Sequence, residues 1–289
     1  MKYIWSILLM LICGCAKQSN RPIVPEHPQR VISLAPSITE TVFTIGAEEK
    51  LVGNTDWCNY PEAAKGIARI GGYMTLNAEA ALTVRPDTIL LLAEHAHLRA
   101  KAEELDIPAV MLSNKTVSDI LATITKLGVL LEREAEAESL CSEIKTRMRA
   151  ISRKTETLKK PRVLITVGRN MGNQSIDSVY CVGLPPFHNE LIEMAGGENA
   201  CQLNQPYPRI GAEGILAMNP DIIIDLLDEQ ATPDDIEHAR QDWLQNKQIR
   251  AVQNNQIHVL AGNHTVTPGP RFILLLEQFA QIIRGQTTH

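Results

Sequence analysis

Short apolar stretches alternate with amphipathic ones along residues 30–112. The stretch from Arg30 to Leu34 is rich in β-branched residues, which is typical of a buried strand. Pro36 and Ser37 follow, and the pattern then indicates a helix that runs to Gly46, a residue suited to end it. Further strands are expected near Leu51–Val52, Thr88–Leu92 and Ala109–Leu112, and helices over 78–85 and 97–105. This alternation predicts an α/β fold.

Residues 116–159 have a different pattern, without proline and with glycine only at position 128. Thr116 and Asp119 form a capping-box-like helix start, with aspartate in place of the usual glutamate. From Glu132 to Lys159 strong helix formers dominate, and charges recur at i, i+4 spacing. We therefore expect one long helix that joins the two halves as a rod. A coiled coil is the weaker alternative, because the apolar positions keep no clean heptad.

The alternation of strands and helices resumes after Pro161, which marks the boundary of the second half. The expected strands lie at 162–167, 221–225 and 257–260, and the expected helices at 187–195, 212–218, 234–245 and 270–284. The second half therefore has the same α/β character as the first.

One motif occurs twice, 134 residues apart. Ala78-Glu79-x-x-Leu82-x-x-x-Pro86-Asp87-x-Ile89 reappears as Ala212-Glu213-x-x-Leu216-x-x-x-Pro220-Asp221-x-Ile223. Each copy reads as a short helix, ended by a proline, and then an apolar strand. A second pair, Glu40-x-Val42-x-x-x-Gly46-Ala47-Glu48 and Glu190-x-Ile192-x-x-x-Gly196-Gly197-Glu198, has a spacing of 150. Two long similar halves indicate two lobes rather than a solenoid. A cleft between lobes is a preferred place for a small ligand.

The composition is that of an ordinary globular protein, and 289 residues suffice for two cores. Hydrophobic residues make up 44% and aromatic residues only 4%, so the few aromatic side chains become candidates for specific contacts. The net charge is −5 and no basic stripe occurs, which argues against nucleic acid as a partner.

The N-terminus has the pattern of a targeting segment. Lys2 supplies a positive start, and the apolar run from Tyr3 to Ile12 is too short to span a bilayer as a helix. Gly14-Cys15 at its end resembles a bacterial lipoprotein cleavage box. This predicts a signal peptide over 1–14 and acylation of Cys15; a plain secretory signal with an incidental cysteine is the alternative.

Residues 15–29 are polar and proline-rich and read as an unfolded tether, with a reach of about 45–50 Å when fully extended. The chain is thus expected outside the cytoplasm, lipid-anchored to a membrane. Whether that membrane is an inner or an outer one is left open by the sequence.

Four cysteines follow the targeting segment, at positions 58, 141, 181 and 201, and their spacings match no zinc pattern. Cys181 and Cys201 flank one expected helix and could be bridged, in a compartment that permits disulfides. Free buried thiols are the alternative.

Several motifs, in this order, resemble the helical-backbone substrate-binding proteins of bacterial ABC importers, which carry cobalamin, ferric siderophores or haem. They are 30–40 (RVISLAPSITE), 51–53 (LVG), 57–61 (WCNYP), 71–73 (GGY) and the two Ala-Glu…Pro-Asp repeats. The resemblance covers about residues 30–285 and is closest to the cobalamin-binding branch.

The resemblance implies two similar Rossmann-like α/β lobes, 30–115 and 161–289. Connecting helices over 116–160, which include the long rigid helix, join the lobes. The ligand cleft is expected between the lobes. It also implies little closure on binding, and a monomer that delivers its ligand to a permease dimer with separate ATPase subunits. No cofactor is expected beyond the ligand.

The resemblance gives Glu79 and Glu213, one in each lobe, the role of docking onto arginines of the permease. Both are expected at a helix start, on equivalent faces of the paired lobes. A glutamate in a first helical turn also favours the helix dipole by about 0.3–1 kcal/mol, which is the simpler reading for a single copy.

The same resemblance places the ligand site on loops that leave the carboxyl ends of strands. It implies ligand-binding roles for aromatic residues, whose flat side chains suit a corrin ring, and for polar groups of a late loop. These residues are Trp57, Tyr73, Phe187, Tyr207, Asn263 and His264. The late loop departs from the cobalamin pattern, which has aspartate and arginine nearby. The predicted ligand is a corrinoid, most closely cobalamin, with a ferric siderophore or haem as alternatives.

His95 and His97, preceded by Glu94, could bind zinc or iron if they shared one strand face. The pair is expected between a strand and a helix, where solvated polar residues are common, so no metal site is predicted. His264 as an axial ligand to haem iron or cobalt is a further alternative. None of the nucleophile-elbow, zinc-protease, phosphate-loop or dinucleotide motifs occurs. We predict a binding protein rather than an enzyme; a lipid-anchored metallohydrolase using Glu94, His95 and His97 ranks below it.

Overall fold

The computed structural model describes residues 22–155, 160–169, 176, 178–184 and 187–285. The expected signal peptide, the lipidation site Cys15 and the first part of the tether lie outside these residues. Within them no helix is both long and apolar enough to cross a bilayer.

The N-terminal lobe is built on a four-stranded parallel sheet with the order β2-β1-β3-β4. Its strands are β1 (Val31–Ser33), β2 (Leu51–Asn54), β3 (Thr88–Leu92) and β4 (Ala109–Leu112). Its helices are α1 (Pro36–Thr44), α2 (Ala78–Thr83) and α3 (Ala96–Glu104). Asn77 caps α2, since its side-chain oxygen accepts a hydrogen bond from the Ala80 N–H. All four strands were expected from the apolar pattern.

The C-terminal lobe has a six-stranded sheet of mixed direction, with the order β10-β9-β5-β6-β8 and with β7 beside β5. Its strands are β5 (Arg162–Arg169), β6 (Ser178–Cys181), β7 (Glu198–Asn199), β8 (Arg209–Gly211), β9 (Ile222–Leu227) and β10 (Ile257–Ala261). Its helices are α6 (Phe187–Met194), α7 (Ala212–Met218), α8 (Pro233–Leu244), α9 (Arg250–Gln253), α10 (Asn263–Val266) and α11 (Phe272–Ile283). β6 and β8 pair antiparallel, and the sequence pattern did not indicate them.

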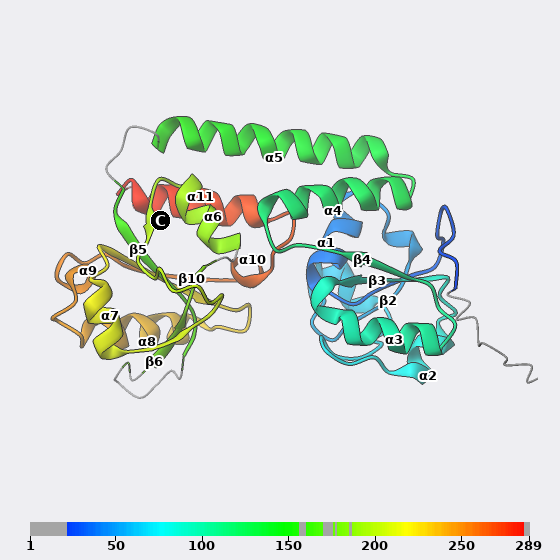
Figure 1. The fold of residues 1–289 in the computed structure, drawn as a ribbon, viewed down its shortest axis with the longest axis horizontal. Coiled ribbons are helices and arrows are strands. Elements are labelled where there is room, and N and C mark those ends of the chain that lie inside the picture. The colour runs from blue at the N-terminus through cyan, green and yellow to red at the C-terminus, as the bar shows by residue number, and fades with distance from the viewer. Residues whose placement is uncertain (1–21, 156–159, 170–175, 177, 185–186, 286–289) are drawn as a thin grey trace, which may run out of the picture.

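Two helices connect the lobes: α4 (Val117–Leu130) and α5 (Glu134–Thr155). Thr116 and Asp119 form the expected capping box, with distances of 3.0 Å and 3.2 Å between the side-chain oxygens and the backbone nitrogens. α5 has 22 residues, about 33 Å at 1.5 Å per residue, and runs above both lobes (Figure 1). It packs on α4 over one lobe and on α6 and α11 over the other. At Gly128 an added Cβ would lie 2.5 Å from the Cβ of Ala137, so the α4–α5 contact requires glycine there.

The buried side of α5 is a stripe at helical spacing, formed by Ala137, Cys141, Ile144 and Ile151. This stripe belongs to one hydrophobic core that continues from β1 and α4 in the first lobe to α6 and α11 in the second. The connection between the lobes is therefore packed rather than flexible. An α/β molecule of two lobes joined by a long helix, as expected from the sequence, is confirmed.

Candidate functional site

A cleft of about 1030 Å³ lies between the lobes, at the large end of the range for small-molecule pockets. Ser37, Trp57 and Tyr73 line it from the first lobe, and Asp228 and Asn263 from the second. Asp228 follows strand β9, so the site occupies the carboxyl edge of that parallel sheet, as in other open α/β folds.

Trp57 and Tyr73 form the aromatic wall of the first lobe. Trp57 is 53% exposed and projects from the loop after β2. Tyr73 is half-buried: its ring packs edge-on against His95, with centroids 4.6 Å apart, and its hydroxyl donates to Glu94 Oε1 at 3.0 Å. Burial raises the pKa of Tyr73, and the nearby carboxylate of Glu94 raises it further. This phenol stays protonated at neutral pH.

Tyr207 is the aromatic group of the second lobe, and 42% of it is exposed. Its pKa is raised by burial and then by Glu94 of the opposite lobe, and Tyr207 in turn raises the pKa of Tyr73. Tyr207 is not among the described residues that line the cleft. Behind Tyr207 lies His188, fully buried, with ring centroids 6.5 Å apart.

Besides Tyr207, two more of the expected ligand residues do not line the cleft. Phe187 is 3% exposed and packs in the hydrophobic core, because it is the first residue of α6 and faces inward. His264 does not line the cleft; its Nε2 lies 3.1 Å from Oε1 of Gln278 on α11. Asn263, next to it, does line the cleft.

The second lobe contributes acidic residues that the sequence reasoning missed, and Asp228, Glu229 and Asp235 line the cleft. Glu229 accepts hydrogen bonds from Asn59 and Asn263, each at 2.7 Å, and so links the two lobes. Asp228 and Glu229 directly follow the buried strand β9, and this position at a strand end was a signal that could have found them.

Arg169 lies at the base of the cleft, with its side chain 2% exposed. Its guanidinium donates to Asp225 at 2.9 Å and to Asp242 at 2.8 Å, and Trp243 donates to the same oxygen of Asp225 at 2.9 Å. Both carboxylates thus hold this positive charge in the protein.

A buried ion pair joins the two lobes next to the cleft residue Asn263, to which Arg271 also donates. Arg271, just before α11, donates to both carboxylate oxygens of Glu40 on α1, at 2.9 Å and 2.7 Å. Its guanidinium also lies 3.5 Å from the ring centroid of Tyr60. Burial raises the pKa of Glu40, and the hydrogen bonds from Arg271 oppose that rise. At Gly269 an added Cβ would lie 3.3 Å from Ser37 of the first lobe, so the backbones of the two lobes approach closely here.

The histidine pair near Glu94 does not form a metal site. His95 is buried and its Nδ1 accepts from the Leu92 N–H at 3.4 Å, whereas His97 Nε2 lies 3.1 Å from the Met74 carbonyl. No cluster of three or more potential metal-ligating side chains occurs among the described residues. The same residues therefore offer no support for the metallohydrolase.

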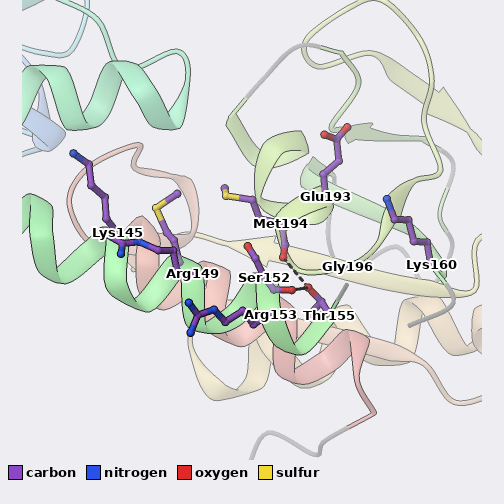
Figure 2. Close-up of a pocket in the computed structure, with 10 residues that line it drawn as sticks. Lys145, Arg149, Ser152, Arg153, Thr155, Lys160, Glu193, Met194 and Gly196 are labelled. Atoms are coloured by element: carbon purple, nitrogen blue, oxygen red, sulfur yellow. Dashed lines mark hydrogen bonds between the residues drawn. The ribbon is translucent and has the colours of Figure 1, made fainter. Parts of the chain in front are cut away.

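A second hollow, of about 590 Å³, lies outside the cleft between α5 and α6 (Figure 2). Lys145, Arg149 and Arg153 follow one another along α5, and Glu193 of α6 lies opposite (Figure 2). Cations near the carboxyl end of a helix complement its dipole. Among the described residues that line this hollow none is aromatic, so the cleft is the better candidate for a ligand site.

The four cysteines of the described residues are buried free thiols in this structure. Of the two alternatives that the sequence left open for Cys181 and Cys201, the structure has the free thiols, and both side chains belong to one hydrophobic cluster of the second lobe.

Comparison with known proteins agrees with this geometry. The family model described as periplasmic binding protein matches residues 31–263. An uncharacterized ABC transporter substrate-binding lipoprotein of Bacillus subtilis, YvrC, is 25% identical over 93% of this chain and 84% of its own. The vitamin B12-binding protein of Pectobacterium carotovorum is 25% identical over 87% of each chain. The periplasmic haem-binding protein of Pseudomonas aeruginosa has the same fold, with a TM-score of 0.76 at 24% identity over 90% of this chain and 94% of its own.

The matched residues include both sheets and the long helix that joins them. The chain therefore belongs to the periplasmic binding protein family, and within it to the helical-backbone class of ABC importer substrate-binding proteins.

Proposed function

We propose that this protein captures a corrinoid, most closely cobalamin, in the cleft between its lobes. One observation carries the choice among the ligands of the class. The cleft combines exposed aromatic faces with neutral amides and carboxylates, and among its described lining residues the one guanidinium, Arg169, is already bound by two carboxylates.

A corrinoid matches these groups. Its broad macrocycle can stack on Trp57 and Tyr73, and its peripheral primary amides can donate to Asp228 and accept from Asn263. Haem propionates and anionic ferric siderophores would instead bring negative charge beside Asp228, Glu229 and Asp235, for which the described lining residues offer no free cation. The vitamin B12-binding relatives support the same choice.

Haem is the second candidate, because a tyrosine oxygen can ligate haem iron and Tyr73 lines the cleft. The donation from Tyr73 to Glu94 and the raised pKa of this phenol disfavour the deprotonated form that would bind iron.

The test is a calorimetric titration of the whole exported chain, with Cys15 replaced by serine, against cyanocobalamin, haem and a ferric siderophore in parallel. One-to-one binding of cyanocobalamin near or below micromolar is expected. Tight binding of haem or the ferric siderophore, without binding of cyanocobalamin, would contradict the corrinoid assignment. The proposed role in transport would then stand with an iron compound as the ligand.

Delivery is proposed to occur by docking of Glu79 and Glu213 onto a cationic surface of the permease. Both carboxylates are exposed in the first turns of α2 and α7, and neither makes an ion pair in the structure. Leu82 and Leu216, three residues further along each helix and matched in the repeat, are 50% and 43% exposed. Each lobe thus presents a carboxylate beside an apolar side chain. A separate subunit hydrolyses ATP.

The anchor is proposed to be a lipid on Cys15, and the lipoprotein description of YvrC supports it. Mass spectrometry of the mature N-terminus is expected to find acylated Cys15. An unmodified N-terminus after a secretory cleavage would contradict the anchor and leave the ligand assignment untouched.

A further inference from the structure

The repeat places one carboxylate at the same position of each lobe. Glu94 follows strand β3 and Asp228 follows strand β9, and they are 134 residues apart, the spacing of the Ala-Glu…Pro-Asp motifs. Asp228 lines the cleft, and Glu94 holds the hydroxyl of Tyr73, which lines it from the other side. The cleft therefore has one of these two carboxylates on the side of each lobe, Asp228 in its lining and Glu94 behind Tyr73.

Two further carboxylates of the second lobe add to this field. Glu229 and Asp235 line the cleft, and both are held by neutral donors: Glu229 by two asparagine amides, and Asp235 by the Thr232 N–H and hydroxyl. Neutral donors fix the position of a carboxylate without cancelling its charge.

Two of the nearby cations are already neutralised by carboxylates. Arg169 is bound by Asp225 and Asp242, and Arg271 by Glu40. A third, Arg69, is held by neutral oxygens of residues 54–59, and its single charge is outnumbered by the four carboxylates named above. Among the described residues around the cleft, negative charge is thus left in excess. This field also acts on the protein itself, because Glu94 contributes to the raised pKa of both Tyr73 and Tyr207.

Resting on the corrinoid function proposed above, we propose that the cleft selects corrinoids by charge and binds the incomplete, nucleotide-free form, cobinamide, more tightly than cobalamin. Cobalamin carries a phosphodiester in its nucleotide loop, and that negative charge would enter the acidic cleft. Cobinamide lacks the loop and, with one cyanide and one water on cobalt, has a net positive charge. The protein is then a scavenger of corrinoid precursors as well as of the finished vitamin.

The test is a charge series measured by calorimetry on the whole exported chain with Cys15 replaced by serine. The probes are aquocyanocobinamide with one positive charge, cyanocobalamin with none, and a cyanocobalamin derivative in which one side-chain amide is hydrolysed to a carboxylate, with one negative charge. We expect the dissociation constant to rise about tenfold at each step at low salt. The differences should shrink at about 0.5 M salt, where the screening length falls to a few ångströms.

The matched variant is the double substitution Glu94→Gln and Asp228→Asn. Each new amide oxygen can still accept the hydrogen bond from Tyr73 or from the Gln230 N–H, so the geometry is kept and the charge removed. In this variant the dissociation constants of the three probes should differ much less from one another. Glu237→Gln, an exposed change on α8 outside the cleft lining, should leave it unchanged.

Three outcomes separate the inference from the function on which it rests. A charge-ordered series that flattens in the double variant supports it. Equal affinity for all three probes, or tightest binding of cyanocobalamin, overturns the charge selection and keeps the corrinoid function. Absence of binding for every corrinoid overturns both.

Discussion

The two lobes start from the same repeat and end with different sheets. The first lobe stops at four parallel strands, whereas the second adds the antiparallel strands β6 and β8 to its parallel centre. The segment between β6 and β8 carries Tyr207, and the first lobe provides Tyr73 from a loop before α2. The duplicated elements therefore form the framework common to both lobes, and segments outside the repeat carry Tyr73 and Tyr207, the tyrosines expected to contact the ligand.

The difference is sharpest at one matched pair of residues. Glu40 of α1 and Glu190 of α6 occupy the same place in the repeat; Glu40 binds a residue of the other lobe, and Glu190 binds the connecting helix α4. Glu40 binds the Arg271 guanidinium, whereas Glu190 accepts from the Val117 N–H at the start of α4, at 3.1 Å. The same position of the repeat thus holds a buried ion pair in the first lobe and a hydrogen bond from an uncharged backbone N–H in the second.

The largest expected effect is that of Arg271→Ala. It leaves the Glu40 carboxylate buried without its partner, so we expect a loss of about 3–5 kcal/mol of unfolding free energy at pH 7. Denaturant unfolding measures this. Without Arg271 the pKa of Glu40 would rise further above 4.5, so the folded state binds a proton that the unfolded state releases. The penalty should therefore shrink as pH falls towards 5.

Glu190→Ala is the counterpart in the other lobe and should cost only about 1–2 kcal/mol, because it removes one hydrogen bond to a backbone N–H. Equal losses from the two substitutions would mean that the Glu40 pair adds nothing beyond an ordinary hydrogen bond.

The next effect concerns acid stability. Burial lowers the pKa of His188 from 6.5 to about 4, so the folded state keeps the ring neutral while the unfolded state takes up a proton. The contribution is present above pH 6.5 and is lost as pH falls to 4, by about 3 kcal/mol. Unfolding across this range should show a weaker pH dependence in His188→Gln.

His95 is the comparable residue of the first lobe, and burial lowers its pKa too. His95→Gln should remove a further part of the pH dependence. If neither substitution alters the slope between pH 6.5 and 4, the buried histidines are not the source of acid sensitivity.

Docking tests whether the two lobes act as equals. Glu79→Gln and Glu213→Gln should each weaken binding to the permease about tenfold, and the double variant about a hundredfold, because each removes one interfacial charge. Binding to the permease complex in nanodiscs measures this, with cyanocobalamin affinity unchanged. Glu138→Gln, an exposed change on α5, is the control. If only one of the two substitutions weakened permease binding, the two lobes would not contribute equally to docking.

The smallest expected effect compares the aromatic walls. Tyr73→Ala and Tyr207→Ala should each weaken cyanocobalamin binding about tenfold by calorimetry, since each removes a stacking face. Tyr180→Ala, which removes another exposed tyrosine of the second lobe, should have no effect. An unchanged affinity in Tyr207→Ala would restrict the ligand contact to the first lobe.

Local patterns predicted most of the fold. Helix α7 has the expected bounds, and α2, β3 and β9 lie within two residues of theirs, because each combines a clear apolar period with a proline or asparagine at its end. β6 and β8 were missed, since they have only four and three residues. β6 is stabilised by pairing with β5 on one side and with β8 on the other. Such pairing joins segments that are separated in the sequence, so a local pattern does not reveal it.

The site was predictable where chemistry follows position in the chain. Trp57, Tyr73 and Asn263 line the cleft, on loops that the resemblance had indicated. Arg271 was not found, because its partner Glu40 is 231 residues away. The orientation of His264 was also beyond the sequence, since the hydrogen bond to Gln278 is set by how α10 packs on α11.

The close approach at Gly269 leaves no free space for a side chain between the two lobes. A Cβ there would lie 3.3 Å from Ser37 and 3.4 Å from the Glu40 carboxylate. Alanine at this position would therefore require Ser37 to move by a few tenths of an ångström. The missing side chain at position 269 is thus what lets the two backbones lie so close together.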